Sequence, residues 1–236
     1  MRWIKETILP RAATARASLI TTALLALPRN VSPSPRLLLS IGLALLLGST
    51  GEAQEARFEA CTDGLTVADN ATGLLWEKKA GTVGSVVNCD TIPGSCPDPH
   101  DVNNRYAWSN TGTLPDGNAY TDFLAALNTD GFAGHTDWRL PAIEEHQRIM
   151  IGPSAIAGQS PTCTEAQQPC LDPEFASIAG PTFTSIYWSS SSYAPDPNNA
   201  WTAQLIIGAV FNGGRLKTEN HFVRAVRAGS CPIAGT

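Results

Sequence analysis

The basic side chains near the C-terminal end form the first group that could do chemistry. Arg215, Lys217 and Arg227 lie close together in the sequence, and Glu219 is the only acidic residue among them. Guanidinium and ammonium groups bind the oxygens of carboxylates, sulfates and phosphates. These three residues are therefore a candidate anion site, and the alternative is a solvated face with ordinary ion pairs.

A proline-bearing loop supplies the second group. Asp196 and Asn198 alternate with Pro195 and Pro197, and Trp201 follows shortly after. Their oxygens would form part of a calcium shell, which needs roughly six to eight ligands, and an indole ring is a common element of binding surfaces. The prolines equally explain a rigid surface turn. We expect a ligand-binding loop at Asp196, Asn198 and Trp201 without a cofactor, with calcium as the alternative.

The six cysteines could form disulfides, a zinc site or a reactive thiol. An even number favours disulfides in an exported protein, although several pairings are open in principle. Two pairs enclose short loops with the same spacing, and the remaining two lie at opposite ends of the domain. The predicted disulfides are Cys61–Cys231, Cys89–Cys96 and Cys163–Cys170. The spacing typical of zinc sites is absent from the sequence.

The sequence gives little support for catalysis. Motifs of the nucleophile elbow, zinc protease, phosphate loop and dinucleotide-binding types are absent, and the four histidines show no metal-ligand spacing. His135, which lies near Asp137, could be one member of an acid–base pair, but no nucleophile motif accompanies it. We therefore expect a protein that is not an enzyme.

Short elements must position these groups. Apolar residues at 120, 123, 124 and 127 predict a helix. A second helix is expected at 142–150, directly after Pro141, which is a residue type favoured at the start of helices. Expected strands are 64–69 and 73–78, which form a hairpin, and 187–190, 201–207, 209–211 and 221–227. Residues 80–117 and 151–183 are expected to be mostly irregular. The predicted fold class is α+β.

Buried aromatic residues are expected to hold these elements together. Trp76, Trp138 and Trp188 are predicted to lie in the core, because large aromatic side chains dominate core energetics. Arg139 is predicted to form an ion pair with Asp137 or with a carboxylate of the following helix. A single strand over 221–227 would divide its basic groups between two faces.

Residues 1–53 have the pattern of a signal peptide. A basic residue at Arg36, an apolar run at 37–47 and the small pair Gly51 and Ala53 supply its three parts. The run is shorter than the roughly 20 residues of a membrane span, so no span is expected in the mature chain. A start near Val31 would leave a compact signal of residues 31–53. The expected mature domain is 54–236, in a secreted, periplasmic or cell-surface location.

The charge of the mature domain limits its partners. The full chain has 236 residues and a formal net charge of −5, but residues 54–236 carry 10 Lys and Arg against 19 Asp and Glu. The resulting net charge of −9 argues against nucleic acid, which requires a basic footprint. It also disfavours polyanionic glycans.

Five sequence segments together resemble a known bacterial family. They are residues 67–77 (VADNATGLLWE), 134–141 (GHTDWRLP), 187–191 (YWSSS), 199–201 (NAW) and 223–227 (VRAVR). In this order they are similar to the Lcl C-terminal domain, the head of a collagen-like adhesin. The resemblance implies a C-type-lectin-like fold with two short helices, small antiparallel sheets and long disulfide-tied loops.

The resemblance also implies a function. An exported surface or secreted binding module would recognise carbohydrate or another cell-surface ligand, such as a protein. One alternative is a thiol enzyme similar to the formylglycine-generating enzymes, whose reactive cysteines have only Cys231 as a counterpart in the C-terminal part of this chain. Another is a structural subunit of a surface assembly, present as a homo-oligomer.

Overall fold

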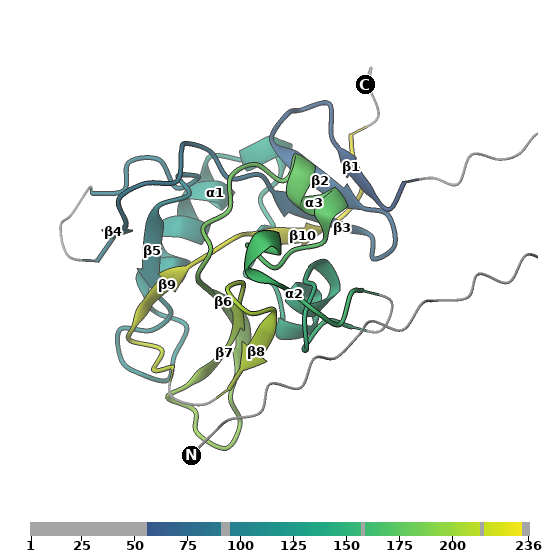
Figure 1. Ribbon diagram of the computed structural model, residues 1–236. Coiled ribbons are helices and arrows are strands. Elements are labelled where there is room, and N and C mark those ends of the chain that lie inside the picture. The colour runs from purple at the N-terminus through teal and green to yellow at the C-terminus, as the bar shows by residue number, and fades with distance from the viewer. Residues whose placement is uncertain (1–55, 91–94, 157–158, 213–214, 233–236) are drawn as a thin grey trace, which may run out of the picture. The chain divides into compact units, whose positions relative to one another are not determined.

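The computed structural model describes residues 56–90, 95–156, 159–212 and 215–232 (Figure 1). The predicted signal peptide and alternative start lie outside these residues. The strands are β1 (Phe58–Ala60), β2 (Thr66–Asp69), β3 (Leu74–Glu77), β4 (Val87–Asn88), β5 (Asn104–Ala107), β6 (Ile186–Ser192), β7 (Ala200–Gln204), β8 (Ala209–Phe211), β9 (Asn220–Phe222) and β10 (Val226–Ala228). The α-helices are α1 (Ala125–Thr129), α2 (Ile143–Ile149) and α3 (Pro173–Ile178), and short π- or 3-10-helical turns lie at Ala119–Leu124, Phe132–Gly134 and Glu165–Gln167. This combination confirms the α+β class.

The first sheet joins the two ends of the domain. Its order is β1-β2-β3-β10, and every pairing is antiparallel. The predicted hairpin β2–β3 is present, and it reverses at Gly73, whose φ of 67° favours glycine. The Cys61–Cys231 disulfide closes the same region.

The second sheet is mixed and has the order β4-β5-β9-β6-β7-β8. Hairpins connect β6 with β7 and β7 with β8, whereas β6 pairs with β9 in parallel. The described residues of 80–117 are mostly irregular, as predicted, but they include β4 and also β5, which lies inside this sheet. Its sequence, with Asn104 and Arg105 beside Tyr106, lacks the apolar alternation of a typical strand.

The predicted single strand over 221–227 is also wrong. The chain forms β9 in the second sheet, leaves it at Val223, and enters the first sheet as β10. All three connecting residues are buried, and Arg224 is only 2% exposed. The expected alternation of basic groups between two faces therefore does not occur.

The helices differ from prediction mainly at their ends. The predicted helix at 120–127 is present as a π-helical turn, Ala119–Leu124, followed by α1. Helix α2 begins at Ile143, two residues after Pro141, because the Glu145 carboxylate accepts a hydrogen bond from the extended Ala142 N–H. Helix α3 was not predicted. It is short, and Asp172 accepts a hydrogen bond at its start.

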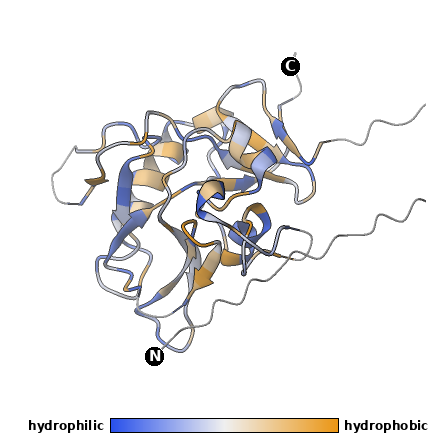
Figure 2. Ribbon diagram, viewed as in Figure 1, coloured by the Kyte–Doolittle hydropathy of each residue, from blue (hydrophilic) through white to orange (hydrophobic). Residues whose placement is uncertain are grey.

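The core consists of two packed clusters. Trp188 and Trp138 belong to one, and Trp76 belongs to the other, as predicted. Arg139 forms its expected ion pair with Glu145 of α2, at 2.7 Å. Figure 2 shows the edge strand β8 in the hydrophobic colour, and its Phe211 side chain is exposed.

Three disulfides tie the loops to this framework. Their pairing is the one that the spacing predicts: Cys61–Cys231, Cys89–Cys96 and Cys163–Cys170. In the described part of the chain, no helix is long and apolar enough to cross a membrane.

Candidate functional site

Three loops contact one another and form what we call the loop face: residues 109–117, 193–199 and 215–219. The backbone of Lys217 joins all three, because its N–H donates to Asn198 O and its carbonyl accepts from Ser109 N–H, both at 2.8 Å. A further bridge connects Asn199 with Leu216. The loop face therefore contains four of the six predicted binding residues, Asp196, Asn198, Arg215 and Lys217, and Trp201 follows it directly on β7.

The Asp196 carboxylate holds the tip of the β6–β7 hairpin. Its oxygens accept hydrogen bonds from the Asn198 N–H and side-chain amide, both at 3.2 Å, and from the Asn199 amide at 2.6 Å. Backbone hydrogen bonds from Asp196 to Tyr193 and from Asn199 to Asp196 complete the turn. The carboxylate is therefore occupied by its own loop.

Trp201 pairs with a second aromatic side chain at the base of this hairpin. The Tyr193 and Trp201 rings meet edge to face, with centroids 5.9 Å apart and planes at 85°. Both residues are half-buried. Edge-to-face pairs are a favourable aromatic geometry, so the two rings hold each other in place while part of each remains accessible.

Asp116 plays the same part in the 109–117 loop. Its carboxylate accepts hydrogen bonds from the Ser109 and Thr111 hydroxyls and from the Asn110 N–H, at 2.8 to 2.9 Å. Hydrogen bonds from Ser109 above all lower the pKa of Asp116 to about 2. The loop is thus shaped by an ionised side chain at neutral pH.

The three basic residues of the candidate anion site have separate surroundings. Arg215 lies 3.9 Å from Glu219, and Arg227 forms an ion pair with Asp137 at 2.6 Å. Lys217 is 1% exposed, with its ammonium 3.9 Å from the centre of the Trp108 ring. Arg227 belongs to β10 of the first sheet, whereas Arg215 and Lys217 belong to the loop face.

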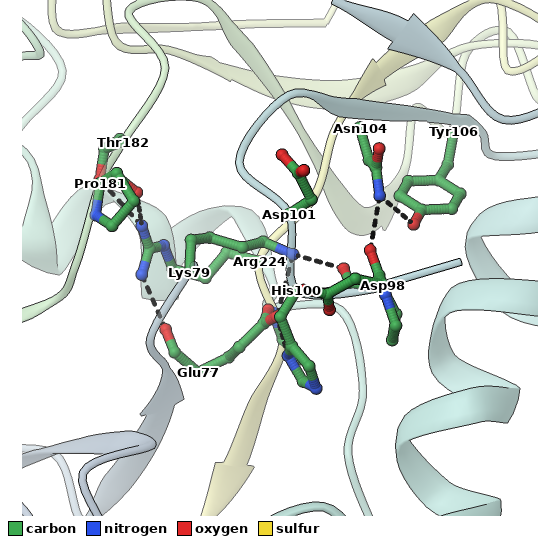
Figure 3. A network of polar contacts seen from close by, with 12 residues as sticks. Glu77, Lys79, Asp98, His100, Asp101, Asn104, Tyr106, Pro181, Thr182 and Arg224 are labelled. Atoms are coloured by element: carbon green, nitrogen blue, oxygen red, sulfur yellow. Dashed lines mark hydrogen bonds and ion pairs between the residues drawn. The ribbon is translucent and has the colours of Figure 1, made fainter. Parts of the chain in front are cut away.

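A buried network of charged side chains lies elsewhere, at the end of β3 (Figure 3). Glu77 is fully buried, and its Oε1 lies 2.9 Å from Lys79 Nζ and 2.8 Å from His100 Nδ1. Burial alone would raise the pKa of Glu77, but Lys79, His100 and the Ala225 N–H together lower it. Glu77 is therefore an ionised group in the interior.

Arg224 completes the network from the opposite side (Figure 3). Its guanidinium donates to the carbonyls of Glu77, Ala179 and Pro181 and to the Thr182 hydroxyl. Both oxygens of the Glu77 carboxylate are also occupied, the second by Ala225 N–H. With donors and acceptors satisfied inside the protein, this network suits a structural role better than catalysis.

This network was not predicted from the sequence. A usable signal existed, because Glu77 follows a run of three apolar residues and Arg224 lies between Val223 and Ala225. A charge inside an apolar run, as at Arg224, predicts a buried charge that must be paired, whereas Glu77 stands at the end of its run and is followed by two lysines. The partner could not be identified, because Glu77 and Arg224 are far apart in the sequence.

One cavity, of about 200 Å³, lies beside the Cys89–Cys96 disulfide. Tyr106, Phe123 and Asp122 contribute to its lining. Among the described residues, no group of three or more His, Cys, Asp or Glu side chains is placed to hold a metal ion.

One short antiparallel sheet, one mixed sheet, long loops and three disulfides define a disulfide-tied α+β domain. The model of the Lcl C-terminal domain family matches residues 65–227. The chain therefore belongs to this family, as its sequence segments predicted. None of the curated proteins and none of the solved structures matches the chain. The C-type-lectin-like fold stays a prediction.

Proposed function

We propose that this protein is a non-catalytic, surface-associated module that binds neutral carbohydrate through the loop face and the adjoining aromatic pair. The observation that carries the proposal is the edge-to-face contact of Tyr193 with Trp201 at the base of the hairpin that Asp196 stabilises. Rigid, half-exposed aromatic rings provide contact area at little cost in conformational entropy.

A neutral ligand fits the charges better than a sulfated one. Two of the three basic residues expected to bind an anion are engaged: Arg227 with Asp137, and Lys217 beneath the surface. The net charge of −9 over residues 54–236 would also repel a polyanion. Binding should therefore depend little on salt.

The disulfides support a non-enzymatic function outside the cytoplasm. A thiol enzyme requires a free, ionisable cysteine, and all six cysteines form disulfides. Disulfides also persist mainly in oxidising compartments. We infer a secreted, periplasmic or cell-surface protein, with a surface protein or a second copy as the alternative partner.

A glycan array with neutral and sulfated sugars, at low and high salt, tests this function. We expect salt-insensitive binding to neutral glycans, with an affinity that falls at least about tenfold in Trp201→Ala, as at an aromatic hot spot. Phe211→Ala is the matched control. Phe211 is exposed on β8 and is paired with Thr202, whose side chain points away from the Trp201 face. Binding to no glycan, or equal loss in both variants, would contradict the proposal.

A further inference from the structure

The ammonium of Lys217 lies at the centre of the loop face. Its Nζ donates hydrogen bonds to Thr113 O, at 2.9 Å, and to the Ser192 hydroxyl. It also lies 3.9 Å from the centroid of the Trp108 ring. One charged atom therefore contacts the 109–117 loop, the end of β6 and the aromatic core, while its own backbone belongs to 215–219.

We propose that Lys217 is a positioning residue, whose ammonium is the internal cation that organises the loop face and makes a metal ion unnecessary there. The inference rests on the proposed function only in identifying the loop face as the binding surface. In this inference, the side chain of Lys217 holds the three loops together, as a bound metal cation would otherwise do.

The surroundings of the ammonium are those of a cation site. Both hydrogen-bond acceptors are neutral oxygens, and the ring face supplies further negative potential. In the described part of the chain, no ion pair includes Lys217, so these contacts replace a carboxylate. Burial lowers the pKa of Lys217, as expected for a charge held without one.

Two of the three carboxylates of the loop face are already used by their own loops, and the third, Glu219, lies 3.1 Å from His221 Nε2 and 3.9 Å from Arg215 Nη1. Asp196 accepts three hydrogen bonds from Asn198 and Asn199, and Asp116 accepts three from Ser109, Asn110 and Thr111. Calcium would have to break these contacts to obtain its oxygen ligands. The predicted calcium alternative at Asp196 and Asn198 is therefore disfavoured by the chemistry of the donors.

Hydrogen–deuterium exchange of the full protein tests this inference directly. Lys217→Met keeps the length of the side chain and removes its charge. We expect exchange in segments 109–117 and 193–199 to become at least roughly tenfold faster, in line with the loss of charge-assisted hydrogen bonds. Exchange in the β2–β3 hairpin should stay unchanged, and neither millimolar calcium nor a chelator should alter the wild-type pattern.

Two further variants make the result decisive. Lys78→Met removes a half-exposed lysine outside the loop face and should leave both segments as in the wild type. Ser192→Ala removes one acceptor at an exposed position and should accelerate the same segments, so it decides the question if Lys217→Met does not fold. Unchanged exchange in the folded variants, or protection of wild-type loops by calcium, would overturn the inference.

The two proposals fail in different ways. Hydrogen–deuterium exchange requires no glycan, so it tests whether Lys217 organises the loop face even if the array shows no binding. Conversely, glycan binding that requires calcium would overturn the inference about Lys217 and leave carbohydrate recognition intact.

Discussion

Arg227 of β10 donates two hydrogen bonds to the carboxylate of Asp137, with Nε 2.6 Å from Oδ1 and Nη2 3.2 Å from Oδ2. The pair connects the last strand with the segment that precedes α2, across 90 residues of sequence. It explains why Arg227 is not available to the loop face, and why Arg139 takes Glu145 as its partner instead.

We expect this pair to contribute modestly to stability. Asp137 is 59% exposed, so a double-mutant cycle of Asp137→Asn and Arg227→Gln should give a coupling energy of about 1 kcal/mol or less. The free energy of unfolding of the four proteins in urea measures it. High salt should reduce the coupling, and a value well above 2 kcal/mol would show that the contact is shielded from solvent.

Glu77→Gln should lower the free energy of unfolding far more than loss of the Asp137–Arg227 pair. The substitution leaves Lys79 charged beside a neutral amide in the interior, and loss of one partner from a buried ion pair costs about 3 to 5 kcal/mol. Urea unfolding would measure the loss. Glu174→Gln, at an exposed position of α3, should change the free energy of unfolding by about 0.5 kcal/mol or less. Similar values for both variants would contradict a structural role of the network.

Acid should destabilise the protein through His146. Burial above all lowers its pKa from 6.5 to about 4 in the folded state. Between these pH values the unfolded chain binds more protons, so stability is lost as the pH falls from 6.5 towards 4. The contribution of this residue is about 3 kcal/mol.

Urea unfolding of His146→Gln across this pH range measures that contribution. The variant should lose less stability on acidification than the wild type, whatever its stability at neutral pH. His135→Gln, at a half-buried position outside the core, should retain the wild-type slope. An unchanged slope in His146→Gln would assign the acid sensitivity to other groups.

The disulfides should differ in their effect on stability. Cys61 and Cys231 are separated by 170 residues and Cys163 and Cys170 by 7. In the chain-entropy model, replacing the first pair by alanine costs about 5 kcal/mol and the second about 2 kcal/mol. Urea unfolding of the two double variants compares them, and equal losses would show that loop closure is not the main effect.

Local patterns predicted much of the framework. The β2–β3 hairpin, the helix around Phe123 and the three disulfides follow from apolar spacing, turn residues and cysteine separation, and the structure contains all of them. Trp76, Trp138 and Trp188 are buried, as predicted, because each removes a large apolar area from water.

The features that local sequence patterns did not predict depend on tertiary contacts. Strand β5 exists because β9 pairs with it, although its own residues lack strand periodicity. The break between β9 and β10 depends on Arg224, whose four acceptors come from two distant segments, the end of β3 and residues 179–182. Likewise, the sequence alone predicts that the basic side chain of Lys217 lies on the surface. In the structure, neutral oxygens and the Trp108 ring hold it inside the protein.

The joined ends of the first sheet have an architectural consequence. The Cα atoms of Cys61 and Cys231 are 5.1 Å apart, so the chain enters and leaves the domain at nearly the same point. Such a domain can be inserted into a surface loop of a host protein, because the two loop residues that it connects can stay close together. Circular permutation, with the old ends linked and new ends opened in an exposed turn, should be tolerated for the same reason.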